Sequence, residues 1–347
     1  MKIAVLMGGT SFEREFSLES GRNVTRLLES LGHTVLPLDT TPQLVQTLRE
    51  QKPDAAYIAL HGKTGEDGTI CSLLEFLGIP FVGSSAGVCR MAWNKSVLPH
   101  AVLAYLNANT TTSSYTSMLA RIGLINAINL PTDGFKEMGL ATALDLVDSP
   151  ANKRLSCGYP LVVKPARGGS AMGIARVDNK EQLAIALLDA LSFDNEVLLE
   201  PWINGVELAV TVLGSGSNAY ALAPVEIAPK QGFFNTDARL DSELVDYYCP
   251  PRPASLPATA LDAIKLAAVS VHRAFGCRDL SRVDMIWGHK ANAKQDTNMS
   301  DAKAYVLEIN TSPGMTEHSL VPMACKAEDI NLATLLERLL KEAIARA

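Results

Sequence analysis

A glycine-rich segment between Lys164 and Gly173 has the composition of a phosphate-binding loop. Small residues such as Gly168 and Gly169 let several backbone N–H groups approach an anion, and Lys164 and Arg167 add positive charge. The lysine precedes the glycines, so the segment is not a P-loop, in which the lysine follows them before a helix. We expect a hairpin that covers phosphates; the alternative is a flexible hairpin without a ligand.

A second cluster combines acidic residues with an arginine on two predicted strands. Arg282 and Asp284 are two residues apart on one strand, and Glu308 and Asn310 are two apart on another, so each pair leaves one face of its strand. Their oxygen atoms suit Mg²⁺, which also takes oxygens from phosphates. The turn 311–316, TSPGMT, places backbone N–H groups beside them, which favours an anion site over a hydrated sheet face.

A third candidate is the segment Glu200-Pro201-Trp202-Ile203, followed by Glu207. A strand that ends at a proline would form a hinge with exposed backbone groups for an adenine edge, and Glu207 would accept hydrogen bonds from ribose hydroxyls. The alternative is an ordinary turn between domains.

Three residues near the N-terminus have both a structural and a functional interpretation. Thr10-x-x-Glu13 matches the capping box of a helix start, whereas a carboxylate at the carboxyl edge of a sheet would bind a substrate ammonium. His61 would ordinarily be a loop residue with a structural hydrogen bond, and Lys95 a solvated lysine.

The elements that must position these residues differ between the two halves of the chain. Strand patterns at 3–7, 34–38 and 55–59 alternate with helix patterns at 17–31 and 43–50, which predicts βαβ units on a parallel sheet. From residue 159 onward the pattern favours an α+β arrangement with antiparallel strands. The predicted strands are 159–164, 174–177, 196–200, 208–213, 220–227, 282–287 and 304–309, and the predicted helices are 181–192 and 257–275.

Composition narrows the class of protein. Lys plus Arg is 31 and Asp plus Glu is 37, so the net charge is −6 and no basic footprint for nucleic acid is expected. The six cysteines form no C-x-x-C pair, which favours reduced thiols in the cytoplasm. The apolar run after Lys2 is too short for a signal peptide, and no stretch approaches the roughly 18 apolar residues of a membrane span.

Taken in order, the motifs resemble those of the D-alanine:D-alanine ligases of the ATP-grasp superfamily. The matching segments are GGTSxERE at 8–15, HGxxGEDG at 61–68, Lys95, the glycine loop, Arg282-x-Asp284 and ExNTSPGMT at 308–316. The resemblance implies an α/β and α+β ATP-grasp fold. It would comprise an N-terminal Rossmann-like domain (1–88), a central glycine-loop domain (89–203) and a C-terminal antiparallel-sheet domain (204–347).

The resemblance also implies an activity and its cofactors. The enzyme would join two D-alanine molecules through an acyl phosphate for peptidoglycan synthesis, using ATP and two Mg²⁺ or Mn²⁺ ions in the cytoplasm, and dimers are common in the family. The implied catalytic residues are Glu13, Ser170, Arg282 and Gly314, and the implied substrate-binding residues are His61, Ser319 and Leu320. ATP would contact Lys95, Lys164, Glu200, Trp202, Ile203, Glu207 and Arg239, and the metal ions would bind Asp284, Glu308 and Asn310.

The segment 233–240 departs from the family pattern. Arg239 stands where a phosphate-binding lysine is usual and keeps the positive charge, whereas Leu240 replaces the usual tyrosine of the acceptor pocket. Leu240 therefore keeps open a ligase that uses D-lactate or D-serine as acceptor. A separate alternative, of a different class, is an ATP-grasp protein that binds nucleotide without ligase activity.

Overall fold

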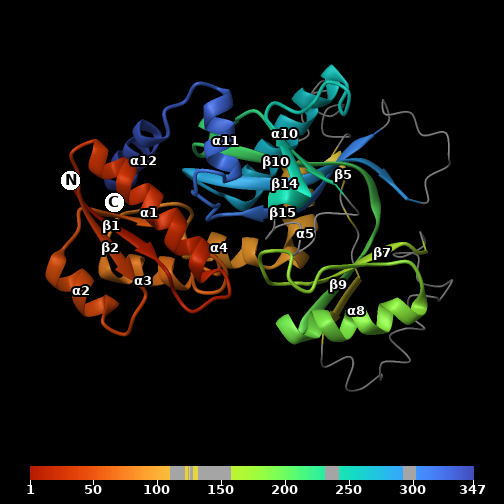
Figure 1. Ribbon diagram of the computed structural model, residues 1–347, viewed down its shortest axis with the longest axis horizontal. Helices are drawn as coiled ribbons and strands as arrows, with labels where there is room; N and C mark the ends of the chain where they lie inside the picture. The colour runs from red at the N-terminus through yellow and green to blue at the C-terminus, as the bar shows by residue number, and fades with distance from the viewer. Residues whose placement is uncertain (110–121, 124, 126–127, 132–157, 231–241, 292–301) are drawn as a thin grey trace.

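The computed structural model describes residues 1–109, 122–123, 125, 128–131, 158–230, 242–291 and 302–347. Its strands form one parallel sheet and two largely antiparallel sheets, with helices against them (Figure 1). The mixed fold class expected from the sequence is confirmed, while the domain boundaries stay a prediction.

The N-terminal sheet is parallel, in the order β2 (Thr34–Asp39), β1 (Lys2–Met7), β3 (Ala55–Ile58) and β4 (Phe81–Val82). Its connections contain α1 (Arg14–Ser30), α2 (Leu44–Gln51) and α3 (Thr69–Leu77), and α4 (Ala86–Trp93) follows β4. The predicted strands and helices are therefore present, with α1 beginning three residues earlier than expected.

Alternate residues of β1 face two different hydrophobic clusters. Ile3 and Val5 pack in a cluster with α1 and with α12 (Leu332–Arg346), whereas Ala4 and Leu6 pack with α2 and α3. The sheet is thus covered on both faces, as buried parallel sheets are. Helix α12 therefore packs against one face of the first sheet of the chain, and both termini lie beside this sheet (Figure 1).

The small sheet carries the glycine loop. Its order is β6 (Ile128–Pro131), β9 (Glu196–Pro201), β7 (Leu161–Pro165) and β8 (Ala175–Val177), and its paired strands are antiparallel. Helix α8 (Lys180–Phe193) packs on it through a core that includes Leu183 and Leu187. The predicted hairpin of β7 and β8 around the loop is confirmed.

The large sheet has the order β13 (Val245–Tyr248), β12 (Val225–Pro229), β10 (Ile203–Leu213), β14 (Leu280–Lys290), β15 (Lys303–Asn310) and β5 (Ile122–Gly123), with β11 (Tyr220–Ala221) beside β10. Helices α5 (Leu98–Asn109) and α10 (Ala258–Phe275) share a core with it around the fully buried Trp287. Helix α11 (Leu320–Ala327) packs against β10 and β12.

One predicted strand was wrong. The segment 220–227 forms two short strands rather than one, because they are separated at Leu222–Pro224 and a proline has no N–H to donate to a sheet. Most of residues 107–148, whose sequence shows no clear helix or strand period, lies outside the described residues, as does most of the segment 290–303 between β14 and β15.

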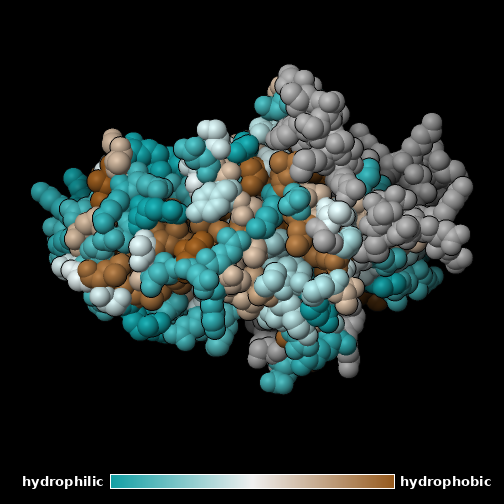
Figure 2. Space-filling view, turned by 90° about the horizontal axis from the view of Figure 1, so that it is seen from above, coloured by the Kyte–Doolittle hydropathy of each residue, from teal (hydrophilic) through white to brown (hydrophobic). Residues whose placement is uncertain are grey.

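The five cysteines among the described residues are free thiols. None of the helices described is long and apolar enough to cross a bilayer. In the view from above, hydrophilic side chains cover much of the periphery and apolar residues reach the surface mainly near the middle (Figure 2).

Candidate active site

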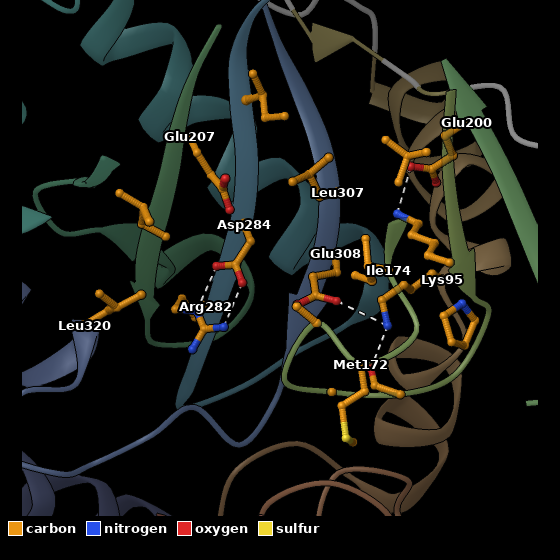
Figure 3. Close-up of a pocket in the computed structure, with 18 of the residues that line it drawn as sticks. Lys95, Met172, Ile174, Glu200, Glu207, Arg282, Asp284, Leu307, Glu308 and Leu320 are labelled. Carbon is orange, nitrogen blue, oxygen red and sulfur yellow. Dashed lines mark hydrogen bonds and ion pairs between the residues drawn. The ribbon is translucent and has the colours of Figure 1, made fainter. Parts of the chain in front are cut away.

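A cavity of about 360 Å³ lies where the glycine loop, the large sheet and α11 meet (Figure 3). Twelve of the residues expected from the sequence line it: Lys95, Lys164, Glu200, Trp202, Ile203, Glu207, Arg282, Asp284, Glu308, Gly314, Ser319 and Leu320. Glu13, Ser170 and Asn310 line a smaller adjoining cavity, which shares Lys95, Arg282 and Glu308 with the first. His61 lines neither cavity, and Arg239 lies outside the described residues.

The acidic cluster results from the register of β14 and β15. Arg282 pairs with Asn310 and Asp284 with Glu308, so that four polar side chains share one sheet face. The register shifts directly after Asp284, which leaves Leu307 as an extra residue in β15. Such a bulge redirects neighbouring side chains, and here Leu307 and Glu308 both line the cavity.

Two cations neutralise this cluster. The Arg282 guanidinium holds Asp284 through two hydrogen bonds of 2.7 Å, and Lys95 Nζ lies 3.2 Å from Glu308 Oε2 (Figure 3). Burial by itself would raise the pKa of Glu308, but the charges of Lys95, Arg282 and Lys164 more than offset it and lower that pKa. Glu308 is therefore ionised at neutral pH.

The environment of Glu207 raises its pKa, in contrast to that of Glu308. Burial raises the pKa of its carboxyl to about 8, and the negative charges of Asp284 and Glu308 add to the effect.

Among the described residues, no three His, Cys, Asp or Glu side chains are grouped closely enough to hold a metal by themselves. The donors expected for Mg²⁺ are two carboxylates and the amide of Asn310, which leaves coordination positions for phosphate oxygens and fits that ion.

Lys95 is held against the glycine loop by its backbone and its side chain. Its N–H donates to Ala166 O at 2.9 Å, and its Nζ donates to Gly168 O at 2.7 Å. The lysine is buried rather than solvated, because the loop and Glu308 enclose it. Arg167 does not add its charge to the cavity, since it pairs with Asp194 at 2.9 Å and Glu196 at 2.6 Å.

The tip of the loop reaches the start of α1 in the N-terminal part of the chain. Ser170 Oγ donates a hydrogen bond to Glu13 Oε1, and Ser170 and Ala171 have φ of 54° and 56°. This left-handed conformation costs an L-residue about 1 kcal/mol. Gly62 has φ of 70°, and a Cβ there would lie 2.5 Å from Glu13 Oε2, so a larger residue would be strained and would displace that carboxylate.

The capping-box interpretation of Thr10 and Glu13 is wrong. Glu13 is itself the N-cap residue of α1, and its side chain makes no capping hydrogen bond. Its carboxylate is directed to Ser170 instead.

The hinge after β9 differs in part from expectation. The Trp202 N–H donates to Pro160 O at 3.1 Å and its carbonyl accepts from Ala291 N at 2.9 Å, so these backbone groups already have protein partners. Its indole N–H donates to Asn204 at 2.8 Å, and Arg176 lies 4.6 Å from the ring. The backbone N–H and carbonyl of Trp202 are therefore not free for an adenine edge, although the residue lines the cavity.

Lys164 and Glu200 form a buried ion pair on neighbouring strands of the small sheet. The distance from Lys164 Nζ to Glu200 Oε2 is 2.8 Å (Figure 3). Both side chains line the cavity, Lys164 beside the start of the glycine loop and Glu200 at the end of β9.

His61 is buried behind the cavity wall. Its Nε2 lies 3.2 Å from Ser20 Oγ and its Nδ1 lies 3.7 Å from Glu66 Oε1. The ring of Phe16, with its centroid 4.8 Å from that of His61, lines the cavity in its place. His61 thus makes structural contacts in this structure, and its substrate-binding role stays a prediction.

The turn after β15 brings Gly314 and Ser319 to the cavity. Ser319 Oγ accepts from Thr316 N at 3.0 Å and lies 2.8 Å from Thr316 Oγ1, and it precedes the first residue of α11. A carboxylate beside Ser319 and Leu320 would meet the N–H groups of that helix end.

Several lining residues were not predicted as site residues, among them Phe16, Met172, Leu307 and His318. Phe16 lies three residues after Glu13, a spacing that puts both on one side of a helix start and offered a signal for it. The bulge that exposes Leu307 has no such local signal.

Comparisons with known proteins point to one family. A model of the C-terminal part of D-Ala–D-Ala ligases matches residues 124–341, and a model of the N-terminal part matches residues 41–84. Among solved structures, the chain is similar to D-alanine–D-alanine ligase from Bacillus anthracis in complex with ATP (27% identity, 100% of this chain and 98% of that chain, TM-score 0.72). It is also similar to the VanG D-Ala:D-Ser ligase from Enterococcus faecalis (26% identity, 99% of each chain, TM-score 0.74).

Proposed function

The chain belongs to the D-alanine–D-alanine ligase family of ATP-dependent ligases, and on that premise we propose that it joins two D-alanine molecules into D-alanyl-D-alanine for peptidoglycan synthesis. The observation that carries the proposal is the reach of the glycine loop. Its Gly168 carbonyl contacts Lys95, and its Ser170 contacts Glu13. One loop thus links the proposed phosphate end of the site to the proposed ammonium end.

In the first step the carboxylate of one D-alanine attacks the γ-phosphorus of ATP, a new C–O–P linkage forms, and ADP leaves. The Glu13 carboxylate accepts hydrogen bonds from the ammonium group of this D-alanine, while Lys95 and Lys164 face the phosphates of ATP. Glu200, Trp202, Ile203 and Glu207 surround the adenine and ribose, which suits the apolar and carboxylate lining there. Bound at Asp284, Glu308 and Asn310, two Mg²⁺ ions would neutralise charge on the phosphoryl oxygens.

In the second step the amine of the other D-alanine attacks the acyl carbon. A C–N bond forms, the C–O bond to the phosphoryl group breaks with its electron pair leaving on phosphate, and the released phosphate takes up the proton that the attacking nitrogen loses. Arg282 and the Gly314 N–H face the developing oxyanion, and the start of α11 at Ser319 and Leu320 receives the acceptor carboxylate. The glycine loop covers the site and excludes water, which would otherwise hydrolyse the acyl phosphate.

The test is phosphate release from ATP and Mg²⁺ with D-alanine alone, and then with D-serine or D-lactate added. Turnover with D-alanine alone and formation of the dipeptide are expected. Turnover that requires D-serine, the acceptor named for the similar VanG enzyme, or D-lactate would reassign the acceptor. ATP binding without turnover under all conditions would contradict the proposal.

A further inference from the structure

Phe16 is an aromatic residue of the cavity lining to which the proposed mechanism gives no task. Phe16 lies in the first turn of α1, half-buried, and lines the cavity. A Cβ built on Gly314 would lie 2.7 Å from Phe16 Cζ, so the ring edge touches the backbone proposed to face the oxyanion. The ring therefore contacts the proposed carboxyl end of the first D-alanine, and Phe16 follows Glu13, the proposed ammonium partner, by three positions at the start of α1.

The ring has little freedom to move away. On one side it packs against His61 at a centroid distance of 4.8 Å and an interplanar angle of 49°. His61 is in turn held by Ser20 and Glu66 and is 3% exposed. On the other side, Gly314 precedes Met315, whose N–H donates to Ser20 Oγ at 3.2 Å. A larger substrate side chain could not displace the ring without breaking this packing.

We infer that Phe16 sets the upper size limit for the side chain of the first amino acid, the one that is phosphorylated. The inference rests on the proposed function and adds a residue that determines its donor specificity. The α-carbon of that amino acid must lie between an ammonium at Glu13 and a carboxyl group near Arg282 and Gly314, which places its side chain against the Phe16 ring. A methyl group fits there, whereas an ethyl or propyl group meets the ring.

The experiment uses the full-length enzyme with an equimolar mixture of D-alanine and D-2-aminobutyrate, and then of D-alanine and D-norvaline. The mixed dipeptides are separated and their order is read by fragmentation in a mass spectrometer. The variants are Phe16→Val and Phe16→Leu, and Phe12→Val is the matched control, because Phe12 is in the same segment but 87% exposed.

Wild type and F12V are expected to place little D-2-aminobutyrate at the N-terminal position. F16V should raise its share at the N-terminal position by about tenfold or more, since one methylene in a closed pocket changes selectivity by about 10- to 200-fold. F16L, which keeps more of the packing against His61, should give a smaller rise. A variant whose unfolding temperature lies within a few degrees of that of the wild type is taken as folded.

Two results overturn the inference. One is an active F16V or F16L whose N-terminal selectivity stays within twofold of wild type, and the other is a gain confined to the C-terminal position. A wild-type enzyme that makes no D-alanyl-D-alanine would instead overturn the proposed function, and the inference with it, so the two failures are distinguishable. If F16V fails to fold, the F16L result decides.

Discussion

Replacement of Arg282 separates its structural task from its proposed catalytic one. The guanidinium is 6% exposed and makes two 2.7 Å hydrogen bonds to Asp284. In R282A the Asp284 carboxylate would lie beside Glu207 and Glu308 without its cation. Breaking a buried ion pair from one side costs about 3–5 kcal/mol, so the free energy of unfolding should fall by that order in the absence of Mg²⁺.

Turnover should fall further than stability explains. If Arg282 faces the oxyanion of the second step, its removal should lower kcat by about 10²- to 10³-fold, the usual effect of losing one such donor. ATP binding should change little, because Lys95 and Lys164 remain. R282K is the matched variant: it keeps the charge but loses the two-pronged geometry, so it should recover much of the stability and little of kcat.

The assays are ADP release at saturating D-alanine, ATP binding by calorimetry, and denaturant unfolding with and without Mg²⁺. All are run below the unfolding temperature of the least stable variant. A folded R282A with more than a third of the wild-type kcat would refute the catalytic assignment and leave Arg282 as a structural partner of Asp284.

Three further predictions concern other parts of the molecule. E13Q should raise KM for the first D-alanine by about 10- to 100-fold and S170A by less, with the double variant E13Q/S170A no worse than E13Q; strictly additive effects in initial-rate measurements would contradict a shared site. Burial lowers the pKa of His272 to about 4 in the folded protein, whereas its pKa in the unfolded chain is near 6.5. Between pH 4 and 6.5 the unfolded state therefore binds more protons at this residue than the folded state does. The stability that neutral His272 provides is therefore complete above pH 6.5 and falls by about 3 kcal/mol as the pH drops to 4, an effect that H272Q should remove from pH-dependent unfolding curves. Chelation with EDTA should abolish phosphate release and excess Mg²⁺ should restore it, and turnover unaffected by EDTA would exclude the proposed metal site.

His272 also illustrates how burial and hydrogen bonding select one protonation state. Its Nε2 lies 3.1 Å from the Gly214 carbonyl, which can only accept, so Nε2 carries the proton. Its Nδ1 then accepts from Ser281 Oγ at 2.7 Å. A second proton on the ring would turn Nδ1 into a donor and place a charge in a side chain that is 0% exposed.

The sequence by itself determined the features that depend on neighbouring residues. The glycine loop lies between two short apolar strands, so its hairpin followed from composition and spacing. The two-residue spacing of Glu308 and Asn310 placed both on one strand face, as did that of Arg282 and Asp284. Alternating apolar segments likewise predicted the parallel sheet. These are properties of chain geometry at short range.

Only the tertiary structure decided which distant residues meet. Ser170 finds Glu13 across 157 positions, and no local pattern distinguishes that contact from the capping box that the sequence also allowed. That Phe16 lines the cavity while His61 lies behind it depends on how α1 packs beside the turn after β15. Periodicity fixes the face on which a side chain lies, whereas register and packing between elements fix what that face meets.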